Sequence, residues 1–276
     1  MAAVDMNRRV LPGFGLSLGY TMFYMSLVVV VPIAAGVLKA SHLSLAEFWH
    51  AVSSDRAIAA YRLTVGTSAA SALVNVVLGA LVAWVLVRYE FPLKGLLDSL
   101  VDFPFALPTA VAGLVFSSLF VKNGWYGRLL VPLGIEGAYS RLGIVIVLVF
   151  IGFPFVVRTL QPVLEGLERD VEEAAACLGA NRLQTVVRVV FPSIVPAMVT
   201  GFALAFARAL GEYGSVVFIS GNMPFKTEIA AVLVVNRLEE FAYNEAAAIA
   251  VVLLAIGFVT LFAINLLERW MTRHHV

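Results

Sequence analysis

Six long uncharged stretches of apolar residues constrain the fold of this chain more than any other feature. They cover residues 10–38, 63–87, 103–121, 142–157, 189–207 and 246–267. A helix of about 20 apolar residues crosses the roughly 30 Å hydrocarbon core of a bilayer. We therefore predict an all-α polytopic membrane protein with about six transmembrane helices. The whole chain, 1–276, is expected to form a single transmembrane domain with both termini on one side of the bilayer.

The composition agrees with this prediction and excludes several function classes. Hydrophobic residues make up 61% of the chain and charged residues 13%, and a net charge of +1 provides no field that would attract nucleic acid. The lone Cys177 excludes an internal disulfide and a cysteine-based metal site. The sequence also lacks a phosphate-binding G-x4-G-K-[ST] loop and a zinc-binding H-E-x-x-H motif. We therefore expect no catalytic residue, no cofactor-binding residue and no metal ligand.

A charged segment separates the fourth and fifth apolar stretches. Apolar side chains recur there at helical spacing, at Leu164, Leu167, Val171, Ala174, Ala175 and Leu178. Acidic side chains form the other side of this helix, at Glu165, Glu168, Asp170, Glu172 and Glu173. Gly179 is suited to end the helix, and a second short helix over 183–190 is expected to stop at Pro192. We predict a hairpin over 164–192 that lies in water, because anionic headgroups would repel its acidic face.

One arginine belongs to a helix that should span the membrane. Counted from Ile194 at about 1.5 Å per residue, Arg208 lies roughly 20 Å along its helix, where an unpaired charge is costly. Glu212 follows four residues later on the same helix face and can pair with it. The pair either fastens neighbouring helices or contributes positive potential where an anion passes. Gly211 and Gly214 loosen the backbone there, which favours the second interpretation.

Two prolines begin the third apolar stretch. Pro104 and Pro108 stand four residues apart, and proline removes a backbone donor and clashes with the preceding turn. The pair predicts either a kinked helix that faces a pathway or two prolines harmlessly placed in a first helical turn. The sequence leaves both interpretations open.

The charged segment resembles the cytoplasmic EAA loop of ABC-importer permeases. The matching residues are Glu173-Ala174-Ala175, Gly179 and Val189-x-Phe191-Pro192, with Val189 and Phe191 in place of the usual Ile and Leu. Three further segments, 150–165, 201–216 and 220–229, resemble the sulfate/thiosulfate permease family, and most of all its T-type subunit. Residues 104–113 keep one of the two adjacent prolines that this family carries there.

This resemblance implies a type I ABC importer permease fold and a role in sulfate/thiosulfate import. It implies that the hairpin couples to an ATPase through Glu172, Glu173, Ala174, Ala175, Gly179 and Pro192. It also implies a translocation path lined by Pro108, Thr109, Arg208, Glu212, Tyr213 and Ser215. The implied partners are a W-type second permease, two cytosolic ATPase subunits that hold ATP and magnesium, and an extracytoplasmic sulfate-binding protein.

The resemblance further implies a place in a bacterial inner membrane with both termini in the cytoplasm. The charge distribution agrees, because that orientation puts ten Arg and Lys residues of the loops and termini inside and eight outside. The alternatives are a molybdate or tungstate ABC permease, an ion-coupled oxyanion carrier, and a membrane scaffold or receptor.

Overall fold

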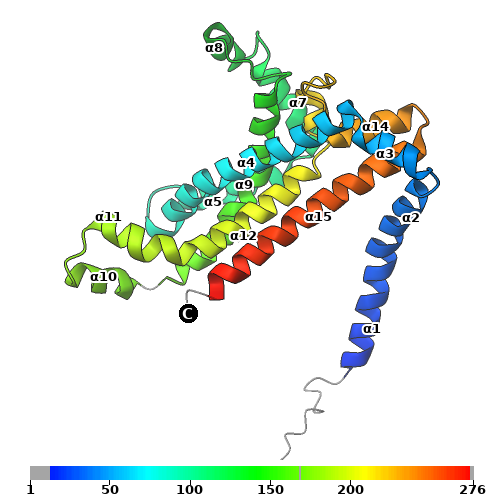
Figure 1. The fold of residues 1–276 in the computed structure, drawn as a ribbon. Coiled ribbons are helices and arrows are strands. Elements are labelled where there is room, and N and C mark those ends of the chain that lie inside the picture. The colour runs from blue at the N-terminus through cyan, green and yellow to red at the C-terminus, as the bar shows by residue number, and fades with distance from the viewer. Residues whose placement is uncertain (1–12, 168, 274–276) are drawn as a thin grey trace, which may run out of the picture.

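A computed structural model describes residues 13–167 and 169–273 of the chain (Figure 1). Glu168, which we had placed on the acidic face of the hairpin, lies outside the described residues. The described part is helical, and five of its helical segments are long and apolar enough to cross a membrane. These segments are Phe14–Ala40, α4 (Asp55–Arg88), α9 (Arg141–Glu165), Arg182–Leu210, and α15 (Tyr243–Arg273), whose apolar span ends at Arg269.

The first spanning segment contacts the other four mainly through its second half, where α2 packs against α15. It comprises α1 (Phe14–Met25), a π-helical turn (Ser26–Val30) and α2 (Val31–Ala40), and the most apolar stretch of the segment has no buried residue. In Figure 1 the blue segment starts at one end of α15, and its α1 part projects away from the bundle that contains α4, α9, α12 and α15. A helix with apolar side chains all around it is stable in lipid or against another membrane subunit.

The core lies where α4, α9 and α12 (Phe191–Leu210) pack together. Val156 of α9 is fully buried between two glycines of the neighbouring helices. A Cβ atom on Gly79 of α4 would lie 2.8 Å from Val156 Cγ1, and one on Gly201 of α12 would lie 3.2 Å from Val156 Cα. Such small residues allow membrane helices to approach closely. The three helices therefore form a tightly packed unit.

The third apolar stretch is two helices instead of one. The chain forms α6 (Phe103–Ala106), is extended at Leu107 and Pro108, and then forms α7 (Thr109–Phe120). Pro104 occupies the first turn of α6, and Pro108 precedes the first residue of α7. The 12 residues of α7 reach about 18 Å, which is shorter than the hydrocarbon core. The described chain thus has five full-length candidate spans and one short apolar helix, where we had expected about six spans.

Short helices and loops connect the spans. They are α3 (Leu45–Ser53), α5 (Lys94–Val101), α8 (Gly127–Leu130), a 3-10 turn (Val131–Leu133), α13 (Val216–Ile219) and α14 (Ala230–Glu239). In Figure 1, α5 lies at the end of the bundle that carries α10 and α11, while α3, α8 and α14 lie toward the other end. Short connecting helices therefore lie at both ends of the bundle.

The charged segment forms a helical hairpin with boundaries that differ from those predicted. Its first arm is α10 (Arg169–Cys177), and Leu164 belongs to the end of α9. Its second arm comprises α11 (Arg182–Thr185) and a π-helical turn (Val186–Val190), and it runs into α12 without stopping at Pro192. The widened π turn directly before Pro192 accommodates a residue that has no backbone N–H to donate.

Candidate functional site

The end of α12 carries a buried carboxylate held by three donors. Arg208 Nη1 donates to Glu212 Oε2 at 2.5 Å, and the backbone N–H and the hydroxyl of Ser215 both donate to Glu212 Oε1 at 3.0 Å. The side chain of Glu212 is 3% exposed, whereas that of Arg208 is 33% exposed. The predicted pair therefore forms, and its positive member is the one that solvent or a ligand can reach.

The loop that contains this carboxylate packs directly against the start of α7. A Cβ atom on Gly214 would lie 2.4 Å from Thr109 Oγ1, and one on Gly113 would lie 2.3 Å from the carbonyl oxygen of Ser215. Both distances are far below a normal contact, and at Gly113, where the close atoms belong to the backbone, only glycine fits. The broken start of α7 and the loop after α12 thus meet at one place.

This contact gathers the predicted path residues. Thr109 contacts the loop after α12, and Ser215 in that loop binds Glu212. Pro108 directly precedes Thr109, in the extended segment between α6 and α7. Tyr213 belongs to the same loop and is 37% exposed. We name Pro108, Thr109, Arg208, Glu212, Tyr213 and Ser215 the path cluster. A partly exposed guanidinium bound to a loop that packs against the N-terminus of α7 suits an anion, because the helix dipole is positive at that end.

The hairpin presents a turn and an exposed surface. Gly179 has a φ of +85°, which favours glycine, and the amides of residues 178–180 donate to the carbonyl groups of residues 174–176 at 2.9–3.1 Å. Glu173 and Ala174 are exposed, and so is Leu178, at 89%. Pro192 is half-buried and lies within the continuous helix at the base of the second arm. The hairpin tip therefore offers acidic and apolar groups to a partner.

Sequence reasoning missed the arginine that contacts this hairpin. Arg88 Nη2, at the end of α4, donates to Glu172 Oε1 at 2.6 Å and to the carbonyl oxygen of Leu167 at 3.3 Å. Its guanidinium carbon lies 5.5 Å from the centre of the Trp84 ring. The only signal in the sequence was a charge at the end of an apolar stretch, which did not identify its partner.

A second missed cluster surrounds Arg158 of α9. Its guanidinium donates to both carboxylate oxygens of Asp102 at 2.9 and 2.6 Å, to Asp98 Oδ1 at 2.6 Å and to Gln161 Oε1 at 2.6 Å. The hydrogen bond from Gln161 and then the bonds from Arg158 hold the pKa of Asp98 below its usual value. The cluster fastens the segment before the α6–α7 break to the core.

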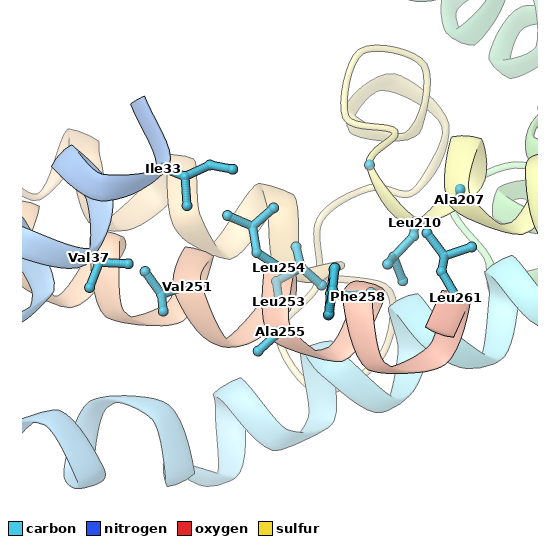
Figure 2. Close-up of a pocket in the computed structure, with 12 residues that line it drawn as sticks. Ile33, Val37, Ala207, Leu210, Val251, Leu253, Leu254, Ala255, Phe258 and Leu261 are labelled. Carbon is cyan, nitrogen blue, oxygen red and sulfur yellow. The ribbon is translucent and has the colours of Figure 1, made fainter. Parts of the chain in front are cut away.

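An apolar cavity of about 560 Å³ lies where α2, α12 and α15 meet (Figure 2). The side chains labelled in Figure 2 are all hydrocarbon, among them Ile33, Leu210 and Phe258. A sulfate-like anion would find no hydrogen-bond donor on these side chains. Nor do the described residues contain a group of three or more His, Cys, Asp or Glu that could hold a metal ion.

Comparison with known proteins decides the class of the chain. A family model described as the inner membrane component of binding-protein-dependent transport systems matches residues 75–273. The chain belongs to this family. It is 52% identical over 254 residues to the sulfate transport system permease protein CysT of Synechocystis sp., covering 92% of this chain and 89% of that protein. It is also 47% identical to the protein of the same name from Escherichia coli, covering 95% of each.

Solved structures agree with the fold. A bacterial ABC transporter involved in the import of the acidic polysaccharide alginate matches with a TM-score of 0.76 at 16% identity. The match covers 93% of this chain and 95% of that one. The predicted type I importer fold and the resemblance to the T-type permeases are therefore confirmed.

Membership in the family defines the general role of the chain. The chain is a multi-pass inner membrane component of a transport system that depends on a binding protein. It is the non-catalytic membrane subunit, and a separate subunit hydrolyses ATP. Because a system of this kind is driven by ATP, an ion-coupled carrier and a membrane scaffold are no longer alternatives for this chain.

Proposed function

We propose that the chain is the membrane-spanning permease subunit of an ATP-driven sulfate and thiosulfate importer and forms half of its translocation path. The observation that carries this proposal is the high identity, over nearly the full length, with permeases named for sulfate transport in two different bacteria. The second half of the path would come from a W-type permease partner. An extracytoplasmic sulfate-binding protein would deliver the anion.

The path cluster supports an anionic substrate. The Nε and Nη2 groups of Arg208 donate to no acceptor in the part of the chain that the structure describes, and the side chain is one-third exposed. Glu212 cancels the formal charge of Arg208. A neutral pair with free donors lowers the cost of moving a dianion through the membrane without holding it tightly. Selectivity would then come from the binding protein.

The hairpin supports coupling to an ATPase. In our proposal both termini and the hairpin lie in the cytoplasm, and Glu173, Ala174, Ala175 and Gly179 enter a groove on the ATPase. Closure of the two ATPase subunits around ATP and magnesium would push the hairpin. Because the second arm is continuous with α12, a push there would move the helix that carries Arg208. The same helix thus joins the proposed energy input to the proposed path.

Transport by the purified complex tests the substrate and the energy source. The permease would be placed in liposomes with its partner permease, the ATPase and the binding protein, and uptake of radiolabelled sulfate measured. We expect uptake that requires ATP and is inhibited by excess thiosulfate. Stronger inhibition by molybdate than by thiosulfate would favour the molybdate or tungstate permease instead. Uptake driven by an ion gradient, by the permease alone, would contradict the proposal.

A further inference from the structure

Two neighbouring carboxylates of the hairpin have different surroundings. Glu172 is 30% exposed and accepts a hydrogen bond from Arg88 at 2.6 Å. Glu173 is exposed and makes no hydrogen bond or ion pair with any residue that the structure describes. The first side chain therefore faces the body of the permease and the second faces away from it. Their roles in coupling should differ accordingly.

Arg88 is held in a confined position at the end of α4. Its side chain is only 12% exposed, and its guanidinium lies against the Trp84 ring. The same Nη2 group reaches Glu172 in α10 and the carbonyl oxygen of Leu167, which belongs to the short connection between α9 and α10. One guanidinium thus contacts both the first arm of the hairpin and the chain that leads into it.

The chain connectivity shows why such a contact matters. The core unit consists of α4, α9 and α12. The hairpin is covalently joined to α9 on one side and to α12 on the other, but α4 ends 84 residues before Glu172 and has no covalent link to it. A displacement of the hairpin reaches α9 and α12 through the backbone. It reaches α4 through the packing of the core helices and, at the end of α4 itself, through the contact of Arg88 with the hairpin.

We propose that the ion pair between Arg88 and Glu172 is the strut that transmits movement of the hairpin to α4. Arg88 and Glu172 are then positioning residues, which keep the three core helices moving as one unit while Glu173 faces the ATPase. This inference rests on the proposed coupling role of the hairpin. A partly buried ion pair suits the transmission of movement. If one partner moved away, the other would be left as an uncompensated charge, so the two groups stay together.

An exchange of the two charges tests the strut in the full complex. The variants are Arg88→Glu, Glu172→Arg and the double exchange, and the quantity measured is sulfate taken up per ATP hydrolysed. We expect each single variant to lower this ratio about tenfold while the ATPase still co-purifies. The double exchange should restore most of the ratio. Unchanged ratios in the single variants, or no recovery in the double exchange, would overturn the proposal.

An exposed ion pair at the same end of the protein provides the matched control. Lys94 and Glu90 are 2.8 Å apart, and the side chain of Glu90 is 88% exposed. Exposed pairs contribute little, so Glu90→Lys should leave the ratio unchanged. If either single exchange fails to accumulate in the membrane, Arg88→Lys and Glu172→Gln take its place, with a smaller loss expected from each. A normal ratio in both milder variants would also overturn the proposal.

Cross-linking from native Cys177 separates the failure of the strut from the failure of the coupling hairpin. Cys177 is exposed at the end of α10. If the unaltered complex shows no cross-link between Cys177 and the ATPase, the proposed coupling role itself fails. If the cross-link forms but the double exchange restores nothing, the hairpin role stands and only the strut is wrong.

Discussion

Arg208 and Glu212 are joined by a hydrogen bond of 2.5 Å, yet the side chain of Arg208 is 33% exposed and that of Glu212 only 3%. This difference in exposure distinguishes two roles for Arg208. An arginine that only holds neighbouring helices together does not need an exposed guanidinium, whereas an arginine that contacts a passing anion does. The pair therefore permits a test in which the two roles give different results.

Substitution of Arg208 should reduce transport. We expect Arg208→Leu to lower sulfate uptake by about tenfold, or about 1.4 kcal/mol of barrier, and Arg208→Lys to retain part of the activity because it keeps the charge. Restoring the charge balance with Arg208→Leu/Glu212→Gln should not rescue uptake. Full rescue by this double variant would show that the arginine only neutralises Glu212.

The contact between α7 and the loop after α12 should tolerate no side chain at position 113. Gly113→Ala places a Cβ atom 2.3 Å from the carbonyl oxygen of Ser215, so the backbone must shift. We expect lower thermal stability in detergent and lower uptake. Gly66→Ala in α4 is the control, because a Cβ atom there meets nothing within 4 Å and alanine favours a helix by about 0.5–1 kcal/mol. Equal behaviour of the two variants would show that the contact is absent in the membrane.

The turn of the hairpin should require glycine at position 179. Gly179→Val forces a β-branched residue to a φ of +85°, so the turn must rearrange. We expect the variant to insert normally but to hydrolyse ATP with little sulfate uptake. Gly134→Val, at a φ of +78° in open space, imposes similar strain far from the hairpin and should keep coupling. Coupling lost equally in both variants would argue for a general folding defect.

One buried amide in α4 should lower the stability of this conformation. Asn75 is fully buried, and neither its Oδ1 nor its Nδ2 has a hydrogen-bond partner among the described residues. An unpartnered buried polar group costs about 1–3 kcal/mol. The isosteric Asn75→Leu should therefore raise the Tm of the detergent-solubilised permease. A lower Tm would mean that the amide finds a partner in the folded protein.

Local patterns predicted most of the fold, because their signals lie within a few residues of one another. The apolar stretches, the glycine turn of the hairpin and the pair at positions 208 and 212 all belong to this class. The continuity of the helix through Pro192 could not be predicted, because it depends on a π-helical turn that no simple spacing reveals. The choice between the two interpretations of Pro108 also needed the structure, which shows that the helix is interrupted there.

Contacts between distant segments were beyond the reach of sequence patterns. The bond between Arg88 and Glu172 joins residues 84 positions apart, and the contacts of Arg158 with Asp98 span 60 positions. Each arginine ends or follows an apolar stretch, where a charge at the membrane surface needs no partner. Only the packing of α10 against α4 and of α5 against α9 shows which carboxylates they meet.

The most direct test of the whole account is thiol labelling of Cys177, the single cysteine of the chain, which is exposed on the hairpin. A membrane-impermeant maleimide would be added to right-side-out and inverted membrane vesicles, with and without the ATPase. We predict labelling in inverted vesicles only, and protection of the thiol when the ATPase is bound. Labelling from the outer side, or labelling that the ATPase does not change, would contradict the central claim that this hairpin receives force from the ATPase.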